Sequence, residues 1–176
     1  VDPERRDQVL SPGTEGDIRV RGPHVMAGYR NLPADTAHAL ADGWLYTGDI
    51  GRLDQDGYLF ITGRKGERLN VGGFKVYPSE VDHVLLAHPD VAEAAAVGVA
   101  DSRYGHVVHA YVVMRPQAEF DEAALIAHCR RHLVDYKVPH VIRPLEALPA
   151  TAAGKLARRQ LAALADEQAA PTPAAR

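Results

Sequence analysis

The sequence is poor in cysteine, in positive charge and in long apolar runs. Its 176 residues contain one cysteine, Cys129, so no disulfide can form within the chain. A single thiol favours a reducing compartment, and we expect a cytoplasmic location. Lysine and arginine (20) are fewer than aspartate and glutamate (23), which gives a net charge of −3. That balance argues against nonspecific nucleic-acid binding, which needs a basic face.

Signals for membrane insertion and secretion are also missing. No apolar run approaches the ~20 residues that span a bilayer. The first ten residues, VDPERRDQVL, lack the apolar core of a secretion signal. They also lack an initiator methionine and begin in the middle of a pattern, which predicts a fragment or a processed piece of a longer protein. The hydrophobic content of 46% is ordinary for a globular protein, so we expect a core.

The first part of the chain is predicted to be rich in β-strands. Residues 17–21 alternate between polar and apolar with a period of two, which indicates a half-buried strand. Residues 33–40 are typical of a short helix with proline at its start. Two further strands, 50–53 and 58–62, are joined by Asp-Gln-Asp-Gly, a sequence that favours a hairpin turn.

Beyond Gly66, apolar periodicity predicts strands and helices in alternation. This interleaving over ~100 residues favours a small α+β domain, a mixed sheet with helices on one side. From Ala165 onward the chain is rich in alanine and proline and is expected to be disordered. The expected elements, in order, are a helix at 78–87, strands at 91–99 and 107–114, a helix at 121–133 capped by Asp121, a strand at 141–145 and a helix at 155–164.

Three short motifs follow one another along the chain. They are YTGD at residues 46–49, GRKGERLNVGGFKVYPSE at residues 63–80 and LPATAAGK at residues 148–155. One such motif recurs by chance, but three in this order are a strong signal. From about Gly16 to Leu161 the sequence resembles the adenylate-forming enzymes, which include acyl-CoA synthetases, aryl-CoA ligases, luciferases and the adenylation domains of peptide synthetases.

The resemblance implies an α+β fold in separate parts. Residues 1–62 would be the β-rich end of a large N-terminal domain, closing a β-barrel subdomain, and residues 63–66 would be a hinge. Residues 67–164 would form a mobile C-terminal lid domain, and 165–176 a disordered tail. The family's phosphate loop, rich in Ser, Thr and Gly, and its acyl pocket belong to the N-terminal domain and are not in this sequence. The isolated chain is therefore expected to be inactive.

Asp49 and Arg64 are the residues expected to bind the nucleotide, together with Thr47. The family uses the aspartate of its TGD motif for the ribose, and Asp49 matches it. A carboxylate can accept hydrogen bonds from both hydroxyls of a ribose diol. Arg64 matches a family arginine that also reaches the ribose. The alternatives are a turn aspartate that binds its own backbone and a solvated arginine.

Lys155 is the expected catalytic residue. In the family's first half-reaction a carboxylate attacks the α-phosphate of ATP, so two anions must meet. A positioned cation lowers that barrier, and losing one such donor typically costs ~10²–10³ in rate. The glycine-containing loop that ends at Lys155 can bring one ammonium group to a closed site. The alternative is an exposed lysine near the end of the chain.

Gly72, Gly73 and Lys75 are expected to bind CoA in the second half-reaction, together with Tyr104 and Tyr136. Glycines let the backbone approach the pantetheine arm closely, and a nearby cation can meet phosphate. The two tyrosines stand where some relatives place aromatic side chains against the adenine of CoA. The alternatives are a bulge or tight turn at the glycines and tyrosines at the edge of a core.

Gly66 departs from the family pattern, because the hinge position is usually Asp or Lys. The family's small domain moves between an adenylation pose and a thioester pose about this point. A glycine should bend easily there but hold either pose less firmly, by ~0.5–1 kcal/mol of backbone entropy.

Two other features are interpreted as structural. Glu80 lies in the first turn of a predicted helix, where its charge suits the helix dipole. His128 and His132 have helical i,i+4 spacing around Cys129, but no carboxylate nearby completes a three-ligand set. We therefore predict no metal site within this chain.

The function predicted from these motifs is the C-terminal part of an ATP-dependent carboxylic acid:CoA ligase. Its partners would be ATP, CoA, a carboxylic acid and the missing N-terminal domain, which would hold most of the Mg²⁺ contacts. One alternative is an adenylation domain that loads a carrier protein. Another is a non-catalytic binding module derived from the lid, which would not need Lys155. The sequence does not name the acid.

Overall fold

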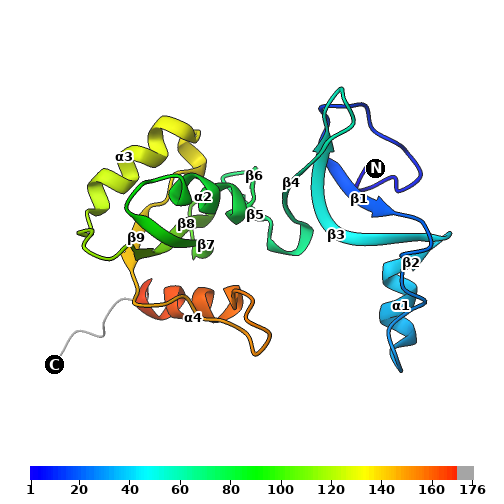
Figure 1. Ribbon diagram of the computed structural model, residues 1–176. Helices are drawn as coiled ribbons and strands as arrows, with labels where there is room; N and C mark the ends of the chain where they lie inside the picture. Colours follow the sequence, from blue (N-terminus) through cyan, green and yellow to red (C-terminus); the bar gives the residue numbers. More distant parts are fainter. Residues whose placement is uncertain (170–176) are drawn as a thin grey trace. The chain divides into compact units, whose positions relative to one another are not determined.

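The computed structural model describes residues 1–169 and contains two compact units (Figure 1). The first unit runs from Val1 to Glu67, and the second begins at Arg68. The boundary lies one residue beyond residues 63–66, the predicted hinge, whose motion stays a prediction. Among the described helices, none has both the length and the apolar character that crossing a membrane requires.

The first unit is built on a four-stranded antiparallel sheet around one long strand, β3 (Trp44–Leu53). β3 pairs with β1 (Gly16–Val20), with β2 (Leu40–Ala41) and with β4 (Leu59–Arg64). The helix α1 (Pro33–Ala39) precedes β2. The β3–β4 hairpin is confirmed, since Asp54 accepts hydrogen bonds from the backbone of Asp56 and Tyr58 in its turn.

β3 starts earlier than predicted, at Trp44 instead of residue 50. Its first residues pair with β1, Leu45 opposite Val20 and Tyr46 opposite Arg19. The next pair along β3 is Ile50 opposite Asp17. Residues 47–49 therefore lie opposite Ile18 alone, and the TGD motif forms a bulge within the strand. Pairing with β1, and with β2 at Trp44 and Leu45, therefore extends the strand through the TGD motif.

The second unit contains a mixed sheet, as predicted. Four strands follow one another in the order β6-β5-β8-β7, and β9 pairs with β8 in parallel. A 3-10 turn, η1 (Lys65–Glu67), ends the first unit, and another, η2 (Asp135–Lys137), precedes β9. The strands are β5 (Leu69–Val71), β6 (Phe74–Val76), β7 (Val91–Asp101), β8 (Gly105–Met114) and β9 (Val141–Pro144).

Helices cover both faces of this sheet, so the prediction of helices on one side is wrong. α2 (Pro78–Leu86) and α3 (Glu122–His132) lie on one face, and α4 (Arg158–Ala169) lies on the other (Figure 1). Alternate residues of β7 explain this arrangement: Ala94 and Ala96 pack on the side of α2 and α3, whereas Val97 and Val99 pack with α4.

The predicted disordered tail begins too early. Ala165 is fully buried against the sheet, and α4 continues to Ala169. Residues 170–176, the remainder of that predicted tail, lie outside the described residues. The start of α4 also differs from the prediction, since the helix begins at Arg158 and leaves Lys155 in the preceding loop.

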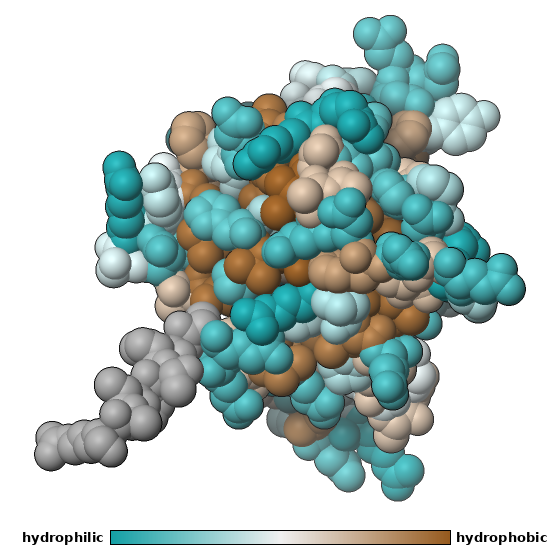
Figure 2. Space-filling model, turned by 90° about the vertical axis from the view of Figure 1, so that its left-hand side faces the viewer, coloured by the Kyte–Doolittle hydropathy of each residue, from teal (hydrophilic) through white to brown (hydrophobic). Residues whose placement is uncertain are grey.

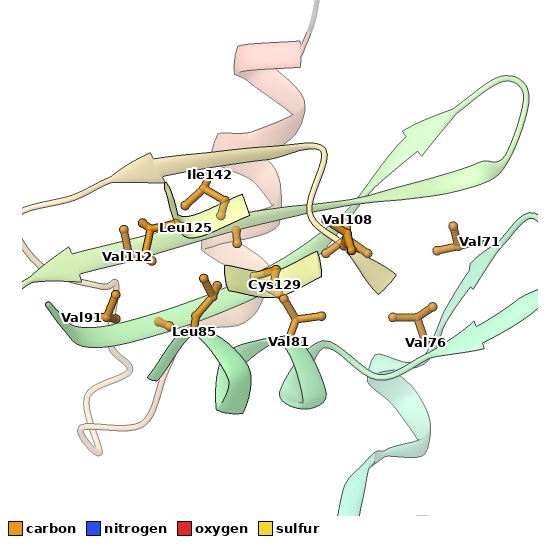
Figure 3. Close-up of a cluster of buried hydrophobic side chains, with 14 residues drawn as sticks. Val71, Val76, Val81, Leu85, Val91, Val108, Val112, Leu125, Cys129 and Ile142 are labelled. Carbon is orange, nitrogen blue, oxygen red and sulfur yellow. The ribbon is translucent and has the colours of Figure 1, made fainter. Parts of the chain in front are cut away.

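The larger core cluster of the second unit lies between α2, α3 and the sheet (Figure 3). Val81 and Leu85 of α2 meet Leu125 and Cys129 of α3, and all four are at most 1% exposed. Asp121 caps α3 by accepting a hydrogen bond from Ala124 N, as predicted.

Outside the core clusters the surface is mixed. On the face drawn in Figure 2, polar side chains (teal) lie among apolar ones (brown). The large apolar residues that the second unit exposes are Phe74, Leu86, Tyr104 and Val134.

Candidate functional site

Asp49 and Arg64 are brought together by the β3–β4 hairpin. They lie directly opposite one another in the strand pairing, and Arg64 Nε is 3.0 Å from Asp49 Oδ1. The Arg64 side chain is 67% exposed, so the pair stands at the surface of the first unit. The carboxylate binds a side chain from the neighbouring strand, whereas the alternative interpretation had it bound to its own turn.

Thr47 fixes the backbone that carries Asp49. Its hydroxyl donates to the carbonyl of Ile18 at 3.1 Å and accepts from the Asp49 backbone N–H at 3.0 Å. The hydroxyl therefore satisfies two backbone groups of the bulge, and Thr47 orients Asp49 within it. The structure thus groups Thr47, Asp49 and Arg64, while their contact with a nucleotide stays a prediction.

A pocket of about 630 Å³ in the first unit adjoins the same bulge. Thr47 and Gly48 contribute to its wall, and so do Asp17 and Lys65, whose side chains form an ion pair of 2.7 Å. The other carboxylate oxygen of Asp17 is buried and has no partner among the described residues. Sequence reasoning missed this pair, which joins the start of β1 to the residue before Gly66.

Lys155 lies on a small closed hairpin between β9 and α4. Thr151 N donates to Lys155 O at 2.7 Å, and Lys155 N donates to the Thr151 hydroxyl at 3.2 Å. Gly154 adopts φ +74°, a conformation that favours glycine, and Ala150 bridges to Leu156. The side chain is exposed, and within residues 1–169 its ammonium group forms no ion pair. The structure therefore presents a cation on a preformed loop.

Gly72 and Gly73 form the two-residue turn between β5 and β6. Their φ values, +58° and +89°, are both in the left-handed region that this kind of hairpin turn requires. The two glycines thus form a tight turn, one of the two structural alternatives, and their contact with CoA stays a prediction. Gly72 N donates to Tyr104 O at 2.8 Å, which places the β7–β8 turn beside the glycines. Lys75 follows on β6 and is exposed.

Two aromatic surfaces accompany the glycine turn. Tyr136 stacks on Phe74 with ring centroids 4.4 Å apart and an interplanar angle of 12°. Tyr136 also packs at the edge of the core, so its structural alternative holds in part. Tyr104 is 40% exposed, with the Arg103 guanidinium 5.2 Å from its ring centre. Phe74 was not predicted, because its position in Gly-Gly-Phe gives no sign of its stacking partner 62 residues away.

Glu80 has the structural role expected for it. Its carboxylate accepts a hydrogen bond from Tyr77 N at 3.3 Å at the start of α2 and pairs with Lys137 at 2.6 Å. One oxygen of Glu80 thus binds η2, which contains Tyr136, while the other binds the start of α2.

The histidines near Cys129 are engaged in packing. His128 Nε2 lies 2.9 Å from the carbonyl of Val84, and its ring contacts those of His88 and His132. Cys129 is fully buried, and burial raises the pKa of its thiol to about 11. Across the described residues, no group of three or more His, Cys, Asp or Glu side chains is placed to hold a metal ion.

Comparison with known proteins gives a consistent family of relatives. Residues 80–155 match the AMP-binding enzyme C-terminal domain. The chain is 48% identical to the 2-succinylbenzoate–CoA ligase of Geobacillus kaustophilus, over 86% of this chain and 31% of that protein. It is 45% identical to the long-chain-fatty-acid–CoA ligase of Salmonella typhimurium, over 88% of this chain and 28% of that protein.

Solved structures give the same result. The o-succinylbenzoate CoA synthetase of Bacillus subtilis, in complex with its acyl-adenylate intermediate, superposes with a TM-score of 0.83 and 40% identity, over 91% of this chain and 33% of that one. The same synthetase was also solved with ATP and a magnesium ion. The amide bond synthetase McbA of Marinactinospora thermotolerans has a TM-score of 0.85 and 40% identity, over 90% and 32% of the two chains. The chain thus spans about 30% of the length of the relatives it matches.

Proposed function

This chain belongs to the adenylate-forming superfamily, of which it carries the AMP-binding C-terminal domain, and on that premise we propose that it is the C-terminal part of an ATP-dependent carboxylic acid:CoA ligase. The complete enzyme would first join the acid to ATP as an acyl adenylate, releasing pyrophosphate. It would then pass the acyl group to the thiol of CoA. The hairpin that presents Lys155 is the observation that carries this proposal.

Lys155 would act in the first half-reaction. A carboxylate oxygen attacks the α-phosphorus as the bond to pyrophosphate breaks, and negative charge accumulates on the phosphoryl oxygens. The ammonium group would stabilise that charge without taking a proton. Its hairpin is already closed by backbone hydrogen bonds, and no ion pair within residues 1–169 has to break before it can meet phosphate.

Asp49 and Arg64 would hold the ribose of the nucleotide. Arg64 occupies one carboxylate oxygen of Asp49, which leaves the other to accept a ribose hydroxyl. The hydrogen bonds of Thr47 hold the backbone from which the Asp49 side chain extends. ATP would bring Mg²⁺, which we expect to be bound mainly by upstream parts of the complete enzyme.

Gly72, Gly73 and Lys75 would serve CoA in the second half-reaction, with Tyr104 and Tyr136. The glycine turn carries no side chain that could obstruct a pantetheine arm, and Tyr104 borders it. The exposed ammonium of Lys75 is suited to a phosphate of CoA. We also propose a cytoplasmic location, supported by the single, fully buried thiol.

The test is pyrophosphate release by the complete ligase, screened first across carboxylic acids to find the substrate. We then expect Lys155→Ala to lower the rate ~10²–10³-fold. Arg159→Ala is the matched control, because it removes an exposed cation four residues away, in the first turn of α4. If both variants kept the parent rate, Lys155 would not be catalytic and the non-catalytic module would be favoured. Replacing CoA with a carrier protein in the same assay tests the acceptor.

A further inference from the structure

One residue of the edge strand β7 has both of its backbone groups bound by side chains. Ala96 N donates to Asp82 Oδ1 at 2.5 Å, and Ala96 O accepts from Arg158 Nη1 at 2.6 Å. Arg158 Nη2 closes the group by donating to Asp82 Oδ2 at 2.9 Å. Edge strands usually leave such groups to water or to another chain. We call Asp82, Ala96 and Arg158 the edge clamp.

The edge clamp joins helices that lie on opposite faces of the sheet. Asp82 belongs to α2 on one face, and Arg158 is the first residue of α4 on the other. Only 12% of the Asp82 side chain and 18% of the Arg158 side chain are exposed. A planar guanidinium can span two acceptors in this way, whereas an ammonium group cannot match the fork. The position of the start of α4 is therefore fixed by two charge-assisted hydrogen bonds.

Arg158 lies close to Lys155 along the chain. Lys155 and Arg158 are separated by Leu156, which bridges to Ala150, and by Ala157, which is buried and donates to the carbonyl of Pro149 at 2.7 Å. Because the hairpin closes on itself, its direction relative to the sheet depends on how its base is held. Ala157 closes the base of the hairpin, and the next residue, Arg158, belongs to the edge clamp.

We propose that Asp82 and Arg158 are positioning residues for the adenylation half-reaction, because the edge clamp fixes the base of the hairpin that presents Lys155. This inference rests on the proposed function, in which Lys155 meets the α-phosphate. The three hydrogen bonds that close the clamp involve no residue assigned to CoA. Loosening it should therefore misplace the ammonium group and leave acyl transfer to the thiol intact.

The experiment measures the two half-reactions separately in the complete ligase. Acyl-adenylate formation is followed without CoA, and thioester formation is followed from supplied acyl adenylate. We expect Asp82→Asn and Arg158→Lys to slow adenylation by ~10-fold to 10²-fold, the range that a small misplacement of a catalytic group costs. Thioester formation should stay within about threefold of the parent rate, as expected for a half-reaction that does not use Lys155.

Loss of stability alone must be separated from misplacement. Cys129→Ser puts a hydroxyl into the core of the same unit and removes none of the hydrogen bonds of the clamp, so it is the destabilised control. Hydrogen exchange of the Thr151 and Gly154 amides should be faster in Arg158→Lys and unchanged relative to the rest of the unit in Cys129→Ser. The proposal would be overturned if the clamp variants slowed adenylation and thioester formation equally. It would also be overturned if Cys129→Ser slowed adenylation selectively, as the clamp variants are expected to do.

Measuring Lys155→Ala in parallel separates a failure of the proposed function of Lys155 from a failure of the clamp inference alone. If Lys155→Ala leaves adenylation unchanged, the proposed function of Lys155 fails, and the clamp inference fails with it. If Lys155→Ala loses adenylation while Asp82→Asn and Arg158→Lys keep it, the proposed function stands and the clamp inference alone is wrong.

Discussion

The two units differ in how much apolar surface they bury. In the second unit, two clusters fill both faces of the sheet. In the first unit, Ile50 is the single large apolar side chain that is buried among the described residues. Its β3–β4 hairpin instead exposes a run of large apolar side chains, each between 47% and 69% accessible: Leu53, Tyr58, Leu59, Phe60 and Ile61.

This contrast shows which part of the chain has a fold of its own. A unit of 67 residues with so little core has little hydrophobic stabilisation, and an exposed apolar strand at a sheet edge is usually a surface that another segment covers. We therefore expect the second unit to behave as an independent domain and the first to depend on upstream sequence.

Separating the units should give the largest effect. We expect residues 68–176 expressed alone to unfold cooperatively in urea and to give a dispersed nuclear magnetic resonance spectrum. Residues 1–67 alone should do neither, because they bury too little apolar surface to offset chain entropy. A cooperative transition of the first piece would show that the contrast is wrong.

Single substitutions sharpen the same contrast. Leu85 is fully buried in the second unit, so Leu85→Ala should lower the free energy of unfolding by about 2–5 kcal/mol. Phe60→Ala in the first unit should change the stability of this chain by no more than about 0.5 kcal/mol, since the side chain is exposed. Urea unfolding followed by circular dichroism measures the effect of Leu85→Ala, and urea unfolding followed by Trp44 fluorescence measures the effect of Phe60→Ala. Equal losses from the two substitutions would contradict the account.

Gly66, near the boundary, offers a smaller effect. No heavy atom lies within 4 Å of a Cβ built at this residue, so a side chain fits. Gly66→Ala should therefore stabilise the chain by ~0.4–1 kcal/mol through its unfolded state. In the complete ligase, Gly66→Asp and Gly66→Pro should change the two half-reactions unequally. Identical rates for all of these forms in both half-reactions would remove the hinge interpretation.

The pKa values of two aspartates in the second unit should be shifted in opposite directions from the ordinary value. Burial raises the pKa of Asp82, against the opposing effect of Arg158. Hydrogen bonds from the backbone N–H groups of Tyr104 and Arg103 lower the pKa of Asp101, which is partly exposed. Ionising Asp82 thus costs stability as the pH rises through its unfolded value of 3.8 toward its folded pKa. Asp101 contributes stability that is lost as the pH falls below 3.8 through its folded pKa.

Carboxyl carbon chemical shifts measured by nuclear magnetic resonance follow both groups in one titration. Asp82→Asn and Asp101→Asn assign the two curves. Asp101 titrating at a higher pH than Asp82 would contradict the environments that the structure gives them.

The sequence predicted local features better than the pairing of distant ones. The hairpin turn at Asp54 and the cap at Asp121 follow from residues close together in the chain. The early start of β3 depends on pairing with β1, which is distant in the sequence. It also depends on pairing with β2 across the two-residue turn Asp42-Gly43, a local signal that the prediction did not use. The extension of α4 to Ala169 depends on the burial of Ala165 against the sheet.

The second face of the sheet could have been predicted, whereas the edge clamp could not. Residues 94–97 of β7 are apolar without alternation, which is typical of a strand covered on both sides. By contrast, the Arg158–Ala96 and Arg158–Asp82 contacts span 62 and 76 positions. Residue types alone do not indicate which charges meet over such separations. The stacking of Phe74 on Tyr136 is hidden in the same way.

The most direct test of the central claim is a single-turnover measurement on the complete ligase, with ATP labelled at the α-phosphate. We predict that Lys155→Ala forms acyl adenylate ~10²–10³-fold more slowly than the parent enzyme. The same variant should pass the acyl group from supplied adenylate to CoA at nearly the parent rate. Undiminished acyl-adenylate formation by Lys155→Ala would contradict the account.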